Sequence, residues 1–196
     1  MFNGIIFNQG VIQKLKKNQK GINIFVKSNL SVRNKDIGIS VCCDGVCLTM
    51  ITYKNRLMEF YLSKETINRS KFKNIRIGDK INLELPLKHG QRISGHICQG
   101  HVDCTSNVKK ITKKGKSIVY EFIIAKQFIS YLIPKASILI NGVSLTISKL
   151  LKNSFQIWVI PHSLKLTNLT HLKKGSIVNV EIDILSKYIK KHHGKK

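Results

Sequence analysis

The sequence predicts an all-β protein built from two small barrels in tandem. The chain repeats itself, because residues 40–49 align with residues 137–146 and residues 77–84 align with residues 174–181, both at an offset of 97 residues. In each half, short runs of β-branched residues alternate with turn sequences. This spacing is typical of a small closed barrel, in which closure removes exposed strand edges.

The clearest strand candidates are rich in Ile, Val, Phe and Tyr, and each follows a turn sequence that contains Lys with Asn or Gly. These strands and the turns before them are residues 21–26 after 17–20, residues 117–124 after 113–115, and residues 155–160 after 152–154.

Three kinds of helix are predicted around the strands. A short helix begins near residues 63–64, and the internal repeat places its counterpart near residues 162–168. Another helix, residues 127–133, is stopped by Pro134, because proline disfavours helical backbone at the residue before it. A last short helix runs from about Leu185 into the basic tail.

The repeat also divides the chain into domains. Gly4 matches Gly100 at an offset of 96, so a one-residue insertion or deletion lies between the two registers. A register kept over most of both halves indicates duplication. Residues 87–94 have the composition of a linker. We therefore expect a first barrel over residues 1–94, a second barrel over residues 95–184, and a helix with a basic tail over residues 185–196.

The net charge of +24 suggests a nucleic-acid or anionic-membrane partner at first sight. Only five of the 34 basic residues are arginine, however, and the lysines are scattered over every predicted turn. Surfaces that read bases favour arginine. Abundant Lys, Asn and Ile are what AT-rich coding DNA produces, so we expect neither nucleic acid nor membrane as a partner. A nucleic-acid-binding pair of barrels stays as a distant alternative.

The N-terminus and the cysteines predict a cytoplasmic protein. The first apolar run is broken by Asn8, Gln9 and Gly10, which is not the pattern of a signal peptide. No apolar run approaches 18 residues. The five cysteines are odd in number, with Cys42 and Cys43 adjacent, and do not resemble a secreted disulfide framework.

Five motifs carry a resemblance to a known family. They are residues 1–6, 45–49, 64–66, 95–103 and 141–146. Their order and spacing over nearly the whole chain resemble riboflavin synthases of the α-chain type. The resemblance implies two six-stranded Greek-key barrels, a C-terminal helix used in trimerisation, and a site for 6,7-dimethyl-8-ribityllumazine on each barrel. It places the active centre between the N-terminal barrel of one subunit and the C-terminal barrel of its neighbour.

The implied reaction moves a four-carbon unit between two lumazines and yields riboflavin and 5-amino-6-ribitylaminouracil, without a metal or cofactor. A dismutation of two identical molecules needs two similar sites face to face, and a duplicated barrel supplies them. Holding both reactants in register contributes roughly 7–11 kcal/mol. No phosphate loop or dinucleotide fingerprint is present. The nearest alternative is a non-catalytic lumazine- or flavin-binding protein of the same fold, which needs only one intact half-site.

Two of the candidate catalytic residues lie at matched positions. Cys47 stands where the second repeat has Ser144, so the two sites differ where the chemistry differs. Cys47 is a candidate for contact with, or transient addition to, a lumazine; the alternative is a small buried residue. His101 is favoured over His96 as the base for the acidic C7 methyl, against the alternative of a hydrogen-bonded loop histidine. The full catalytic set is Cys47, His101, His96, Ser40, Ser144 and Thr146.

A metal site is not expected, although His96, Cys98, His101, Asp103 and Cys104 form a cluster of ligand types. Their spacing fits no standard zinc ligand set.

The resemblance implies two matched sets of substrate-binding residues. Residues 61–66 map onto residues 158–163, and in the family these segments line the pteridine and ribityl pockets; helix capping by Ser63 or Thr66 is the competing explanation. Lys135 is expected to reach the ligand of the neighbouring subunit. The full list of candidate substrate-binding residues is Gly4, Ile5, Ile6, Cys47, Leu48, Thr49, Tyr61, Leu62, Ser63, Lys64, Glu65, Thr66, Gly100, His101, Val102, Lys135, Ser144, Leu145, Thr146, Trp158, Val159, Ile160, Pro161, His162 and Ser163.

Two glycines have two interpretations. Gly45 and Gly142 either let the backbone approach a flat heterocycle or form turns that need a positive φ.

The chain departs from the family pattern at several positions. Asn3 stands where Thr is usual, Ala136 where Gly is expected, and His162 and Ser163 where Glu-Thr is common. Asn141 stands where Asp is usual, which argues against an acid–base role at that position.

Overall fold

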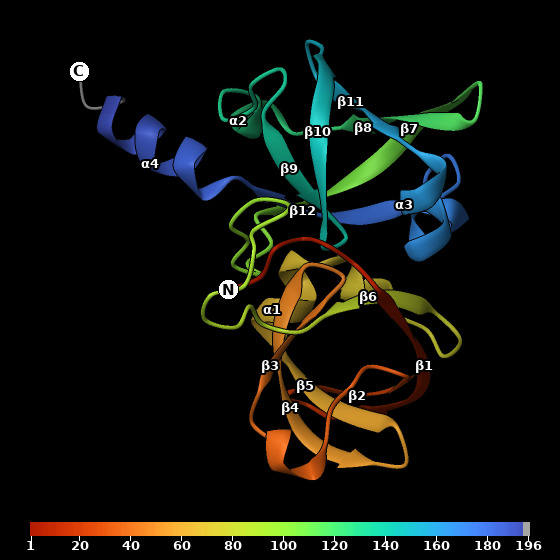
Figure 1. The fold of residues 1–196 in the computed structure, drawn as a ribbon. Helices are drawn as coiled ribbons and strands as arrows, with labels where there is room; N and C mark the ends of the chain where they lie inside the picture. The colour runs from red at the N-terminus through yellow and green to blue at the C-terminus, as the bar shows by residue number, and fades with distance from the viewer. Residues whose placement is uncertain (194–196) are drawn as a thin grey trace.

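The computed structural model describes residues 1–193 and contains two closed barrels of six antiparallel strands, which lie one above the other in Figure 1. The first barrel, red to yellow, consists of β1 (Asn8–Lys17), β2 (Gly21–Ser28), β3 (Ser40–Cys43), β4 (Val46–Lys54), β5 (Leu57–Ser63) and β6 (Lys80–Glu84). The second barrel, green to blue, consists of β7 (Cys104–Lys114), β8 (Ser117–Ile123), β9 (Ser137–Ile140), β10 (Val143–Leu150), β11 (Ser154–Val159) and β12 (Ile177–Ile182).

Short helices lie between the strands, and a last helix follows β12. They are η1 (Asn34–Asp36), α1 (Lys64–Arg69), η2 (Lys71–Asn74), α2 (Lys126–Ile129), α3 (Pro161–Leu166), η3 (Asn168–His171) and α4 (Ile184–His193). Helix α4 extends away from the second barrel (Figure 1). No helix within residues 1–193 is long and apolar enough to cross a membrane. Residues 194–196 of the predicted basic tail lie outside the described part of the chain.

The strand order confirms the predicted six-stranded Greek-key barrels. Around the first barrel the order is β1-β2-β5-β4-β3-β6, and around the second it is β7-β8-β11-β10-β9-β12. In each barrel, three strands consecutive in sequence are neighbours, and the last strand returns beside the first of those three, as a Greek key requires. The bulges match as well, because register shifts occur at Ile12/Lys14 and Met50/Thr52 in the first barrel and at Val108/Lys110 and Ile147/Lys149 in the second.

The helices agree with the predictions except for α2. Helix α1 begins at Lys64, with Ser63 as its N-cap, and α3 occupies the matching place in the second repeat. Helix α2 ends at Ile129, well before the predicted end at residue 133. The chain then tightens into a turn in which the N–H of Leu132 donates to the carbonyl of Ile129, and Pro134 prevents helical backbone at the residue before it.

Each barrel has its own apolar core, but two segments cross from one barrel to the other. The side chain of Ile6, which precedes β1, packs in the core of the second barrel. Val102, which precedes β7, packs against the core of the first barrel. We call residues 3–6 and residues 99–102 the N-terminal and linker crossing segments. A two-way backbone bridge between Phe2 and Cys98 joins the chain beside them, with N···O distances of 2.8 and 3.0 Å.

Buried polar side chains hold the barrels together in a nearly two-fold arrangement. The Asn82 side chain donates to the carbonyl of Asn141 at 2.9 Å, and the Asn179 side chain donates to the carbonyl of Asp44 at 2.8 Å. In the first repeat the Asp44 carboxylate forms a buried ion pair with Lys71. Burial raises the pKa of Asp44, and Lys71 opposes that shift. The corresponding pair in the second repeat, Asn141 and Asn168, is neutral.

Candidate functional site

The first group of predicted site residues gathers on the first barrel, where the linker crossing segment meets β4. The N–H of Cys47 donates to the carbonyl of Gly100 at 2.8 Å. Gly100 has a φ of 77°, and a Cβ there would lie 2.7 Å from the Cβ of Cys47, so only glycine allows this approach. The next residue, His101, is exposed. Ser40 and Thr49 are directly opposite each other on β3 and β4.

The second group repeats this geometry on the second barrel with the N-terminal crossing segment. The N–H of Ser144 donates to the carbonyl of Gly4 at 2.8 Å. Gly4 has a φ of 73°, and a Cβ there would lie 2.7 Å from the Cβ of Ser144. Thr146 on β10 is paired with Ser137 on β9. We call the Cys47 group the first half-site and the Ser144 group the second half-site.

The two candidate histidines belong to different half-sites, although only five positions separate them in sequence. His101 lies in the segment that covers Cys47. The Nδ1 atom of His96 is 2.7 Å from the Oγ atom of Ser144. Burial lowers the pKa of His96, so its ring is neutral at neutral pH. Each half-site therefore combines one imidazole with one Cys or Ser.

The segments that lead into α1 and α3 occupy matching positions, and each exposes one large aromatic side chain. Tyr61 is 41% exposed and Trp158 is 51% exposed. The Oγ of Ser63 accepts the N–H of Thr66 at 3.1 Å, so the capping explanation holds for Ser63. Glu65 forms an exposed ion pair with Arg69.

Other predicted contact residues differ in how accessible their side chains are. Four of them, Ile6, Leu48, Leu62 and Val159, are buried in the barrel cores, so a ligand contact at these positions comes from the backbone. Ile5, Val102, Leu145 and Ser163 are partly buried, whereas Lys64, Ile160, Pro161 and His162 are exposed.

Lys135 is exposed and has an unusual backbone conformation. Its φ is 70°, and its N–H donates to the carbonyl of Ile147 at 2.8 Å. In the first repeat, Gly38 makes the same contact with Met50 at a φ of 95°. The second repeat therefore has its left-handed residue at position 135. Position 136 does not have a positive φ, so alanine can replace the glycine expected there.

The structure gives Gly45 and Gly142 the turn role. Both have a positive φ, 82° and 78°, and both follow a left-handed residue, Asp44 or Asn141, as in a two-residue hairpin turn. Their backbones face each other across the barrel interface. The close backbone approach is therefore between the two barrels.

Three residues that the sequence reasoning missed take part in the half-sites. Ser137 is the counterpart of Ser40. Glu84 and Glu181 are buried at the ends of β6 and β12, and their carboxylates accept backbone N–H groups of the crossing segments. Burial raises the pKa of Glu84 to about 7, and it also raises the pKa of Glu181; the N–H donors oppose both shifts. The available signal was a glutamate at the same repeat position near the end of both strands.

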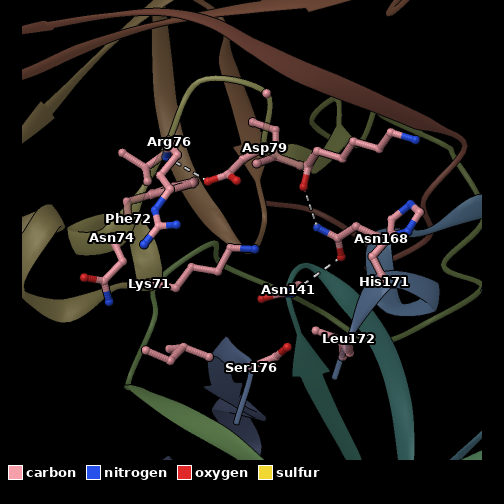
Figure 2. Close-up of a pocket in the computed structure, with 15 residues that line it drawn as sticks. Lys71, Phe72, Asn74, Arg76, Asp79, Asn141, Asn168, His171, Leu172 and Ser176 are labelled. Carbon is pink, nitrogen blue, oxygen red and sulfur yellow. Dashed lines mark hydrogen bonds between the residues drawn. The ribbon is translucent and has the colours of Figure 1, made fainter. Parts of the chain in front are cut away.

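A cavity of about 640 Å³ lies between the barrels and contains none of the predicted site residues. Figure 2 shows Lys71, Arg76 and Asp79 on one side of it and Asn168 and His171 on the other. Asn168 and Lys80 both line the cavity, and the Asn168 side chain donates to the Lys80 carbonyl at 3.1 Å. The cavity is therefore part of the barrel interface and separate from both half-sites.

No group of three or more His, Cys, Asp or Glu side chains within residues 1–193 is placed to hold a metal ion. The ligand-type residues that lie close together in the sequence are divided, because His96 and His101 belong to different half-sites and Asp103 pairs with Lys187.

Comparison with known proteins identifies the repeat unit. The lumazine binding domain family matches this chain twice, at residues 3–86 and 99–183. A riboflavin synthase of Photobacterium leiognathi is 35% identical over 192 residues, which cover 97% of this chain and 88% of the relative. The riboflavin synthase of Bacillus subtilis is 31% identical over 189 residues, which cover 96% of this chain and 88% of the relative.

This chain is also similar in fold to solved structures of LumP. LumP complexed with 6,7-dimethyl-8-(1'-D-ribityl) lumazine superposes with a TM-score of 0.81 at 25% identity, covering 93% of this chain and 99% of LumP. LumP complexed with riboflavin superposes with the same TM-score at 27% identity and the same coverage.

Proposed function

This chain belongs to the lumazine binding domain family, and from that premise we propose that it is a riboflavin synthase. The reaction is the dismutation of two molecules of 6,7-dimethyl-8-ribityllumazine into riboflavin and 5-amino-6-ribitylaminouracil. It transfers a four-carbon unit from one lumazine to the other.

The observation that carries the proposal is the presence of two complete but chemically different half-sites. Both barrels keep the same backbone geometry, in which a hairpin N–H donates to a crossing-segment glycine. The first half-site presents Cys47 and His101, whereas the second presents Ser144 and His96. The two lumazines are identical, but one donates the four-carbon unit and the other accepts it. They therefore need two binding sites that are similar in shape and different in chemistry.

The residues fit the steps of the reaction. His101 is exposed and directly follows Gly100, whose carbonyl accepts the Cys47 N–H, and it is the proposed base for the C7 methyl proton. Cys47 contacts, or adds transiently to, the lumazine on the first barrel. The hydroxyl pairs Ser40–Thr49 and Ser137–Thr146 supply hydrogen-bond partners for the pteridine edges. His96 orients the hydroxyl of Ser144 on the second barrel. Lys135 extends from the second barrel toward the ligand of a neighbouring subunit.

A homotrimer is part of this proposal, because the two faces that meet around the substrates come from neighbouring subunits. Helix α4 carries Leu185, Tyr188 and Ile189, which are 64%, 59% and 58% exposed, at positions that share one helical face. An apolar face of this kind is buried most readily against another copy. A cytoplasmic location also belongs to the proposal, since all five cysteines are free.

A non-catalytic lumazine carrier is the second candidate, supported by the likeness to LumP. The two functions differ in what happens to bound lumazine. The test incubates the purified chain with 6,7-dimethyl-8-ribityllumazine and follows both products, without added metal or nicotinamide. We expect two lumazines consumed per riboflavin formed, at a rate unaffected by a chelator. Tight binding without turnover would favour the carrier, and a strict metal or nicotinamide requirement would overturn the proposed mechanism.

A further inference from the structure

Glu181, near the end of β12, holds the linker crossing segment through two backbone groups. Its Oε1 accepts the N–H of Gln99 at 2.7 Å, and its Oε2 accepts the N–H of His101 at 2.8 Å. The side chain is buried, and it forms no ion pair within residues 1–193. The carboxylate is therefore satisfied by backbone amides alone.

Glu84, at the end of β6, does the same for the N-terminal crossing segment. Its two oxygens accept the N–H groups of Asn3 at 2.8 Å and Gly4 at 3.0 Å. It too is buried and without an ion-pair partner among the described residues. A buried carboxylate is costly unless it is well hydrogen-bonded, and its bonds to N–H donors are stronger than neutral ones.

Each segment leaves the barrel that holds it and docks on the other barrel. The linker crossing segment, held by Glu181 of the second barrel, places the Gly100 carbonyl on Cys47 of the first barrel. The N-terminal crossing segment, held by Glu84 of the first barrel, places the Gly4 carbonyl on Ser144 of the second barrel. The connections are therefore crosswise, because each glutamate belongs to one barrel and its segment completes the half-site on the other barrel.

We infer that Glu84 and Glu181 are positioning residues, each of which sets the geometry of the half-site on the opposite barrel. This inference rests on the proposed function for its consequence in catalysis, but its structural content does not depend on the substrate. Glutamine is the informative replacement. Its one amide oxygen accepts one N–H, while its NH₂ group meets the other N–H as a second donor.

Cys47 is a direct reporter of the first half-site. Its side chain is partly buried and Gly100 lies against its Cβ, so release of the linker crossing segment should make the thiol more accessible. In the full chain without ligand, we expect Glu181→Gln to raise the rate of Cys47 alkylation by iodoacetamide by about tenfold, measured by peptide mass mapping. Glu84→Gln is the matched control, and it should leave this rate unchanged.

The second half-site supplies the mirror measurement. In a Ser144→Cys background, Gly4 lies against the Cβ at position 144. Gly95, whose N–H donates to the Asn3 side chain of the N-terminal crossing segment, lies beside the end of the side chain. Glu84→Gln should raise the alkylation rate of that thiol, and Glu181→Gln should not. Equal effects of both variants on both thiols would indicate general loosening and overturn the inference. No effect of either variant on its crosswise reporter would overturn it too.

Two further measurements separate positioning from folding and from the function itself. In the unmodified protein, hydrogen exchange at the amides of Gln99 and His101 should be at least about 100-fold slower than in free peptides; unprotected amides would overturn the inference even if the variants failed to fold. In steady-state turnover, Glu181→Gln should lower kcat by about 100-fold with a smaller change in KM, because His101 is displaced. Absence of turnover in the unmodified protein would reject the proposed function alone, since the thiol reactivities still decide the positioning role.

Discussion

Gly45 and Gly142 are in backbone contact across the interface between the barrels. A Cβ built on Gly45 would lie 3.0 Å from the amide nitrogen of Gly142, and a Cβ built on Gly142 would lie 2.9 Å from the amide nitrogen of Gly45. Each glycine follows the left-handed residue of a hairpin turn. The two repeats therefore meet at the same residue of the same turn.

Replacing Gly142 with alanine should weaken this interface. The new methyl group would press on the Gly45 backbone, and an alanine would have to keep the φ of 78°. We therefore expect a loss of about 2–4 kcal/mol in the free energy of unfolding by urea. Gly78→Ala is the control, because Gly78 also has a positive φ but nothing lies within 4 Å of its Cβ position. Its cost should be about 1 kcal/mol. Equal losses would contradict a specific contact.

Introducing at Asn141 the carboxylate that Asp44 has in the first repeat should lower the free energy of unfolding. Asn141→Asp places a carboxylate in a buried site without a lysine, so we expect a loss of about 3 kcal/mol in unfolding free energy at pH 8. Adding Asn168→Lys, which copies the Asp44–Lys71 pair, should recover about 1 kcal/mol or more in a double-mutant cycle. Strictly additive effects would show that the two positions are not coupled.

Cys47→Ala and His101→Ala should each reduce kcat more than lumazine affinity. General-base catalysis contributes about 100-fold or more, so a loss of that size is expected for His101→Ala. Turnover is measured by riboflavin absorbance, and affinity by lumazine fluorescence. Cys104→Ser is the control, since that thiol lies outside both half-sites. Unchanged kcat in both test variants would remove Cys47 and His101 from the proposed mechanism.

Glu84 should make stability depend on pH between about 4.5 and 7. Burial raises its pKa to about 7, so the folded state binds a proton that the unfolded chain releases near pH 4.5. The contribution is complete below pH 4.5 and is lost as the pH rises through 7, and it amounts to a few kcal/mol. Urea unfolding from pH 4.5 to 8 should show a smaller decline for Glu84→Gln than for the unmodified protein. Parallel curves would mean that Glu84 titrates normally.

A fragment of residues 1–94 tests the proposed domain division. It keeps β1 to β6 but lacks Gly100 and Val102, which cover Cys47 and the first core. We expect it to fold and to self-associate, with the N-terminal segment of one copy on the hairpin of the other. It should bind lumazine with poor turnover, because no Ser144 face is present. Sedimentation, lumazine fluorescence and riboflavin production measure these properties, and full activity would refute complementary halves.

The residue pattern alone predicts the duplication, the strand-rich halves and the turns. Asp44-Gly45 and Asn141-Gly142 are local hairpin signals, and the offset between them predicts two copies of one fold. Family resemblance added the six-stranded Greek key, which the strand order confirms. The residues of the two half-sites could be paired by the same offset, as Cys47 and Ser144 were.

Which barrel each crossing segment completes depends on long-range packing and could not be predicted from the residue pattern. His96 and His101 are close in sequence, yet they serve opposite barrels, because the chain between them passes through the interface at Cys98. The exchange of Ile6 and Val102 between the cores is a long-range packing choice. Residue periodicity reports which side chains are buried, but it carries no information on which core buries them. Glu84 and Glu181 are likewise identified as positioning residues by their backbone partners, which residue periodicity does not reveal.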